Sequence, residues 1–345
     1  MEEKEGNGAL LFVRAGGASC GVWRNSVKRL CLAVVGIVLL ALISMVIGSY
    51  SLTWTAVFRG DGGNDQMVVF ASRVPRTLAL VLAGMSLAIV GLIMQMLARN
   101  RFVEPTTAGT VESATLGILV VTMLAPASSI FSKMLVATLF ALIGTGLFLL
   151  ILARIPLRSP LVVPLIGIML GGVISSVTTF FAYRHDLLQS LGAWTTGDFS
   201  GVIRGRYELL WISAILGIIA YLMADRFTVA GMGQEFTTNL GINYGAVLAG
   251  GLAIVAMVTA VNVVTVGAIP FLGLVVPNIV SMIMGDNVRR AIPWVAVGGA
   301  GFVLACDIIG RVVRYPYEIP IGTVVGVVGS VMFLGMLLRR SARVG

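Results

Sequence analysis

Few residues in this sequence have the type and spacing that catalysis or metal binding requires. The only histidine, His185, stands beside Asp186 and has no partner at a metal-ligand spacing. The cysteines Cys20, Cys31 and Cys306 form neither a CxxC pair nor a disulfide pattern. The sequence contains no HExxH motif and no Walker A phosphate loop. We therefore expect no catalytic residue, no metal site and no bound cofactor, and any ATP that powers this protein would bind to another chain.

A charged pair inside an apolar run is the remaining candidate for chemistry. Asp307 lies near the end of such a run, and Arg311 follows it by one helical turn. A carboxylate buried in a membrane can mark a proton or ion relay, but a relay needs partners on other helices and the sequence suggests none. An ion pair within one helix is the simpler interpretation.

The composition indicates which elements would have to position such residues. Of the 345 residues, 58% are hydrophobic and only 11% are charged, whereas a soluble domain is about one quarter charged. The apolar runs are continuous, which argues against the alternating strands of a membrane barrel. At roughly 20 residues per span, the chain has room for about ten helices. The sequence thus predicts an all-α polytopic membrane protein in a lipid bilayer.

Ten spans can be drawn, and the basic residues between them set the orientation. The spans cover residues 30–49, 75–97, 111–126, 132–153, 162–183, 207–224, 244–265, 271–285, 292–310 and 321–338. The side that holds both ends of the chain carries 15 of the 24 Lys and Arg residues, and the other side carries 9. The positive-inside rule then places both termini in the cytoplasm. The net charge of +9 forms no basic patch, so we expect no nucleic-acid partner.

These spans form one domain, which a short N-terminal segment precedes. Residues 1–28 are predicted to be a cytoplasmic segment, because the apolar run that follows is too long for a signal peptide and lacks a cleavage site. Residues 29–340 then form a single transmembrane domain.

Two connections in this domain are too long to be simple turns. The outer segment 184–206 is expected to hold a short helix near Leu188–Thr195. In the inner segment 225–243, a short polar helix is expected between the chain breaks at Gly233 and Gly241. The inner helix is either a docking surface or a solvated loop.

The stretch VTVGAIPFLGLVVPNIVSMIMG, residues 264–285, is apolar but interrupted by Gly267, Pro270, Gly273 and Pro277. We interpret it as the end of one span, an outer turn over Gly267 to Pro270, and a short span that Pro270 begins. The hydrogen bond that Pro277 cannot make must be replaced by neighbouring helices or water. Broken backbone at membrane depth is tolerated inside protein, so the stretch should lie within the bundle and could act as a pivot.

Several blocks together resemble the permeases of bacterial ABC importers for iron–siderophore complexes, the family that includes the vitamin B12 permease. The resemblance covers roughly residues 35–340. Besides the stretch 264–285, it rests on RVPRTLALVLAGMSLAIVGLIMQMLARN (73–100), WTTGDFSG (194–201), GQEFTTNLGI (233–242), CDIIGR (306–311) and YEIPIG (317–322).

Departures from the family pattern indicate one branch of it. The usual asparagine–proline–leucine is Asn100-Arg101-Phe102 here, and a usual histidine is Asn278. These variants resemble permeases for siderophores of the vibriobactin, anguibactin and petrobactin kind. Members of that branch usually work beside a second, different permease, which favours a heterodimer over a homodimer.

The resemblance implies a vitamin B12-type fold of ten transmembrane helices per subunit and import of a ferric siderophore by alternating access. The substrate would pass from the periplasm or cell exterior through the bacterial cytoplasmic (inner) membrane. The implied partners are a second permease subunit, a substrate-binding protein outside and two ATPase subunits inside, which bind the ATP and magnesium. The chain itself is then a transport subunit and not an enzyme.

The resemblance also assigns roles to particular residues. Docking of the binding protein falls to Arg73, Arg76 and Arg311, although arginines at helix ends can simply anchor in the headgroups. Coupling to the ATPase falls to Gly233, Gln234, Glu235, Asn239, Leu240 and Gly241. A cytoplasmic gate would comprise Asn100, Phe102, Arg158 and Ser159, or these would be loops packed against the headgroups.

Other functions remain open at this point. A permease for vitamin B12 or haem would share most of these blocks. An ion-coupled secondary transporter would need no ATPase, but it would be expected to carry ionisable groups near the membrane midplane.

Overall fold

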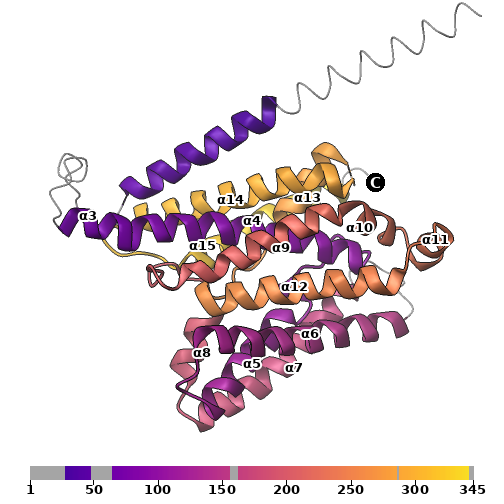
Figure 1. Ribbon diagram of the computed structural model, residues 1–345, viewed down its shortest axis with the longest axis horizontal. Helices are drawn as coiled ribbons and strands as arrows, with labels where there is room; N and C mark the ends of the chain where they lie inside the picture. Colours follow the sequence, from indigo (N-terminus) through magenta and orange to yellow (C-terminus); the bar gives the residue numbers. More distant parts are fainter. Residues whose placement is uncertain (1–27, 48–63, 156–161, 286, 342–345) are drawn as a thin grey trace, which may run out of the picture.

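The computed structural model describes residues 28–47, 64–155, 162–285 and 287–341, and every regular element in these ranges is a helix (Figure 1). Within them, seven helices are long and apolar enough to cross a membrane, and one bent pair passes the same test when its two helices are taken as one span. Two shorter apolar helices, Thr110–Leu124 and Leu272–Met284, bring the bundle to about ten. The predicted all-α polytopic fold is therefore confirmed.

The order of the elements follows the predicted spans closely. After an unlabelled first helix, Lys28–Val46, come α3 (Asn64–Val68), the π-helical turn η1 (Val69–Arg73), α4 (Val74–Leu97), η2 (Pro105–Thr107), α5 (Thr110–Leu124), α6 (Ile130–Arg154), α7 (Val162–Arg184) and α8 (Leu188–Thr195). The second half comprises η3 (Tyr207–Leu209), α9 (Leu210–Leu222), α10 (Ala224–Ala230), α11 (Gln234–Asn239), α12 (Tyr244–Val266), α13 (Leu272–Met284), α14 (Val288–Val312) and α15 (Ile321–Ser341).

Helix α4 is the centre of the bundle and packs against α9, α12, α13 and α14. Glycines make the closest of these contacts possible, because a Cβ on Gly84 would lie only 2.6 Å from the carbonyl oxygen of Gly299 on α14. A Cβ on Gly91 would overlap the backbone of Gly273 on α13. At its outer end the helix is longer than predicted, since η1 and α3 extend it back to Asn64.

The segment after α8 closes, with backbone hydrogen bonds, the end of the bundle that the sequence predicts to be the outer one. The Asp198 N–H donates to the Val266 carbonyl at the end of α12, at 2.8 Å. The Gly322 N–H at the start of α15 donates to the Gly197 carbonyl, at 2.9 Å. Helix α8 spans Leu188–Thr195, as predicted from the sequence.

The opposite end of the bundle, predicted to be the inner one, carries the bent pair. Residues Tyr207–Leu222 and Ala224–Ala230 meet at an angle of 64°, so the span that the sequence placed at 207–224 continues as a second helix, α10. The first part of the expected connection 225–243 is thus helical. The predicted short polar helix is present as α11, at the opposite end of the bundle from α3 and α8 (Figure 1).

Candidate functional site

The helix break lies between α12 and α13. Helix α12 ends at Val266, and Gly267 then takes a positive φ of +84°. Phe271 also has a positive φ, +63°, directly before α13 begins at Leu272. Pro270 is therefore not the first residue of the new helix, as the sequence suggested, because Phe271 turns the chain between them.

Pro277 lies inside α13, and its missing hydrogen bond is replaced from another helix. A proline at this position cannot donate to the carbonyl of Gly273, one turn earlier. The side chain of Gln95 on α4, which is 3% exposed, donates from Nε2 to this carbonyl at 3.2 Å. The stretch is buried in the bundle, as its broken backbone requires.

We call residues 98–109, between α4 and α5, the gate loop. Asn100 is 8% exposed, and its Oδ1 accepts a hydrogen bond from the Phe102 N–H at 2.8 Å. The Phe102 ring meets Phe333 of α15 edge to face, with the ring centroids 5.9 Å apart. The loop thus presents an aromatic contact at the site where the sequence predicted a seal. The other two predicted gate residues, Arg158 and Ser159, lie outside the described residues.

Sequence reasoning missed a buried carboxylate in the gate loop. Glu104 is 1% exposed, and its Oε1 accepts hydrogen bonds from the Phe271 N–H, at 2.8 Å, and from the Thr106 hydroxyl. Glu104 and Thr107 form a capping box around η2, in which the side chain of each accepts a hydrogen bond from the backbone N–H of the other. An acidic residue directly before Pro-Thr-Thr and an apolar run was a signal of this cap that the sequence contained.

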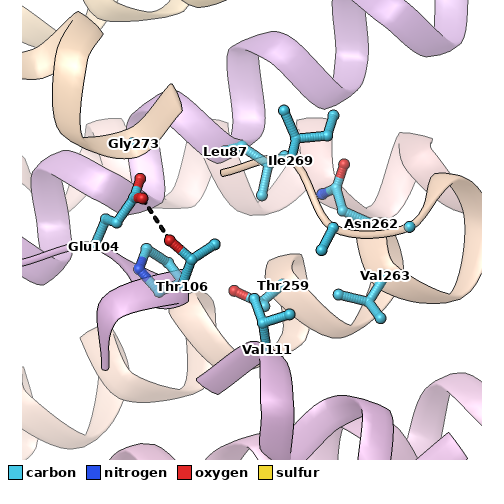
Figure 2. Close-up of a pocket in the computed structure, with 12 residues that line it drawn as sticks. Leu87, Glu104, Thr106, Val111, Thr259, Asn262, Val263, Ile269 and Gly273 are labelled. Atoms are coloured by element: carbon cyan, nitrogen blue, oxygen red, sulfur yellow. Dashed lines mark hydrogen bonds between the residues drawn. The ribbon is translucent and has the colours of Figure 1, made fainter. Parts of the chain in front are cut away.

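Glu104 borders a small cavity of about 20 Å³, which has room for one water molecule. Figure 2 shows Glu104 and Thr106 on one side of the cavity and Asn262 and Val263 of α12 on the other. Two oxygens of the cavity-lining residues, Thr259 Oγ1 and Asn262 Oδ1, are buried without a hydrogen-bond partner. The cavity is too small to hold a siderophore. Among the described residues, no group of three or more His, Cys, Asp or Glu could hold a metal ion.

Two of the predicted docking arginines cap the first helix in this structure. Arg73 Nη1 donates to the carbonyls of Met45, at 2.6 Å, and Val46, at 3.0 Å. Arg311 Nη1 donates to the carbonyls of Ser44 and Ile47, at 3.0 and 2.6 Å. The last carbonyls of a helix have no partner within it, so these guanidinium groups fix the outer end of Lys28–Val46 to the bundle.

Arg76 joins a buried ion network around Asp307. The predicted pair of Asp307 with Arg311 within α14 is present. Arg76 Nη2 also lies 2.8 Å from Asp307 Oδ1, and its Nη1 lies 2.7 Å from Glu318 Oε2. Asp307 therefore has the partner on another helix that the sequence did not reveal. All three predicted docking arginines make contacts within the chain, and docking itself stays a prediction.

The predicted coupling segment forms an exposed tip on a rigid base. Gly233 and Gly241 flank α11 with positive φ values of +116° and +74°. The buried Thr237 hydroxyl donates to the Gly233 carbonyl at 2.6 Å and to the Val229 carbonyl at 3.1 Å, which holds the tip on α10.

The surface of this tip is both polar and apolar. The side chains of Gln234, Glu235 and Asn239 are exposed. So are three large apolar side chains of the same segment, Met232, Phe236 and Leu240. Exposed apolar side chains at a helix tip are typical of a surface that another protein covers.

A polar stripe follows one exposed face of α7. Ser175, Ser176, Thr179 and Tyr183 line an open hollow of about 500 Å³ together with Phe180 and Leu188. The Ser176 hydroxyl donates to the Gly172 carbonyl of its own helix, at 2.8 Å. The sequence had left the substrate pathway unspecified.

Comparison with known proteins identifies the class that this fold and these features define, which is a membrane permease. Residues 36–340 match the FecCD transport family. The chain therefore belongs to the FecCD transport family, and it is a multi-pass protein of the cytoplasmic membrane.

Three similar proteins cover almost the whole chain. The petrobactin import system permease protein YclN of Bacillus subtilis (strain 168) is 50% identical over 306 residues, which is 89% of this chain and 96% of the relative. The ferric-anguibactin transport system permease protein FatD of Vibrio anguillarum is 41% identical over 306 residues, 86% of this chain and 98% of the relative. A solved structure described as an inward-facing metal-chelate type ABC transporter has a TM-score of 0.74 and 25% identity, and covers 91% of this chain and 99% of that one. The predicted resemblance and branch are confirmed.

A double-mutant cycle tests the repair of the helix break. Gln95→Leu leaves the buried Gly273 carbonyl without a donor, so we expect it to lower the free energy of unfolding by about 1–3 kcal/mol. Adding Pro277→Ala supplies a backbone N–H for the same carbonyl and should restore part of this loss. Reversible unfolding of the purified protein in detergent measures both effects. The exposed Gln189 on α8 is the control, and Gln189→Leu should change stability by less than about 0.5 kcal/mol. Strictly additive effects of the two substitutions would contradict this account.

Proposed function

We propose that this chain is the membrane-spanning subunit of an ATP-driven importer that carries a ferric siderophore of the petrobactin or anguibactin kind into the cytoplasm. The observation that carries the proposal is the 50% identity with a petrobactin permease over 89% of this chain. The iron arrives already chelated, so the chain needs no metal ligands of its own. The hydroxyl stripe of α7 suits this role, because it offers weak polar contacts to a bulky, oxygen-rich chelate.

The proposed complex has two permease subunits, two ATPase subunits and a substrate-binding protein. A second, different permease is favoured over a homodimer by the branch to which the relatives belong. ATP and magnesium bind to the ATPase subunits, and both termini of this chain face the cytoplasm with α11. Residues 29–340 act as one transport domain, and residues 1–28 as a cytoplasmic segment.

Each end of the helix bundle contacts one partner. The tip over Gly233 to Gly241 enters a cleft on the ATPase, and its exposed apolar side chains support this contact. At the outer end, Arg73, Arg76 and Arg311 steer and orient the binding protein by charge. Between them, Asn100 and Phe102 keep the cytoplasmic end closed, with Arg158 and Ser159, while Gly267, Pro270, Gly273 and Pro277 serve as pivots.

Uptake by a deletion strain tests the function. Loss of this chain should abolish import of radiolabelled ferric petrobactin-type chelates and leave hydroxamate uptake unchanged, because other permeases serve other chelator classes. Vitamin B12 and haem are assayed in parallel. Loss of B12 or haem uptake alone, or import that continues after the ATPase Walker lysine is replaced, would contradict the proposal.

Substitutions in α11 test the ATPase contact. Phe236→Ser and Leu240→Ser each remove an exposed apolar side chain whose burial is worth about 1.5–3 kcal/mol. We expect each to weaken ATPase association roughly 10- to 100-fold, measured by titrating the ATPase into the permease in nanodiscs. Thr238→Ser on the same helix should bind normally. Wild-type affinity for the ATPase in both serine variants would count against the contact.

A bulky residue at Gly241, whose φ is +74°, should uncouple ATP hydrolysis from uptake.

Charge reversal tests the docking arginines. Arg73→Glu and Arg76→Glu should weaken association with the binding protein by about 10-fold or more, since like charges would face each other. The exposed Arg314 provides the matched control, Arg314→Glu. Because Arg73 also caps the first helix, unfolding of each variant is measured alongside. Unchanged affinity in both reversals would reduce these arginines to a structural role.

A further inference from the structure

Three hydrogen bonds join the gate loop and the end of α4 to α13, on both sides of Pro277. Before the proline, the Phe271 N–H donates to Glu104 Oε1 at 2.8 Å. At the break, Gln95 Nε2 donates to the Gly273 carbonyl at 3.2 Å. After the proline, Asn278 Nδ2 donates to the Arg101 carbonyl at 2.8 Å. The loop and the end of α4 thus contact the first half of α13, from Phe271 to Asn278.

The bond from Phe271 to Glu104 satisfies a backbone N–H that has no acceptor within α13. Phe271 caps α13 without a side-chain hydrogen bond of its own, and its N–H needs an acceptor in this buried site. A carboxylate is favoured there because the amino end of a helix carries partial positive charge. The acceptor comes from 167 residues away in the sequence.

Bonds within the gate loop itself also hold Glu104 in position. The Glu104 N–H donates to Thr107 Oγ1 at 3.0 Å, and the Thr107 N–H donates back to the Glu104 carbonyl at 3.1 Å. The Thr106 hydroxyl donates to the carboxylate itself (Figure 2). Pro105 fixes one backbone angle of the same turn. These local bonds position the carboxylate as an acceptor.

We propose that Glu104 is a latch that makes the gate loop and α13 move as one body during transport. The latch rests on the proposed function and adds a positioning residue to it. A shift at the turn Gly267 to Pro270 moves the start of α13, and Glu104 passes this shift to Phe102 and its contact with Phe333. Without the latch, α13 moves and the gate does not follow.

The test uses the complete transporter, with both permeases, the ATPase and the binding protein in proteoliposomes. In Glu104→Ala we expect ferric siderophore uptake to fall at least tenfold while ATP hydrolysis stays within about threefold of wild type, so that more ATP is spent per chelate. Glu104→Gln keeps an acceptor oxygen in place and should retain at least a third of the uptake. Glu104→Asp draws the carboxylate back by one methylene and should behave as the alanine variant.

A matched control separates the latch from the loss of any capped N–H. Glu208 Oε1 accepts a hydrogen bond from the Gly205 N–H at 2.8 Å in an exposed outer segment. Glu208→Ala removes the same kind of bond and should leave the ratio of ATP to chelate at its wild-type value. A wild-type ratio in Glu104→Ala would overturn the latch. If Glu104→Ala does not assemble, the same ratio of ATP to chelate in Glu104→Gln and Glu104→Asp would overturn the latch.

Hydrogen exchange distinguishes failure of the latch from failure of the proposed function. With and without ATP, amides of residues 98–107 and 271–275 should change protection together in the wild-type complex and separately in Glu104→Ala. This holds whatever the substrate is. Joint changes in wild type without siderophore uptake would reject the function and keep the latch, whereas independent changes in wild type would reject the latch.

Discussion

The close contact between the backbones of Gly91 and Gly273 is the constraint on which the rest of this structure depends. Because neither residue has a side chain, α13 begins in close contact with α4 at Gly91, part-way along that helix, instead of at the membrane surface. A helix that starts there brings unpaired backbone groups into a region without water. Each of them must find a partner in the protein.

The partners come from neighbouring elements, and this links the parts of the transport machinery. Gln95 stands one turn after Gly91 on the same face of α4, where it reaches the carbonyl that Pro277 leaves free. Glu104 reaches the first N–H of the break from the gate loop. The requirement to satisfy buried polar groups therefore also joins segments that lie far apart in the sequence. In this bundle it joins the helix break to the gate loop.

Features that depend on local sequence were predictable, and features that depend on distant partners were not. The short helix Leu188–Thr195, the interruption at Pro277 and the pair of Asp307 with Arg311 were all read from neighbouring residues. The bend before α10 left no such signal. The local cap at Glu104 could have been found from the sequence, but its bond to Phe271 and the bond from Gln95 to Gly273 could not, because these partners are distant backbone groups. The same reason hid the burial of Arg73, whose acceptors are carbonyls at the end of another helix.

The first helix has a consequence for how the protein is made. It lies at the edge of the bundle, with 6% of its most apolar window buried, and the guanidinium groups of Arg73 and Arg311 hold its outer end. Arg311 follows Ile47 by 264 residues. During synthesis Arg73 follows this helix closely, whereas Arg311 is translated much later, as part of α14. The two caps of this helix end can therefore act together only after α14 has been made.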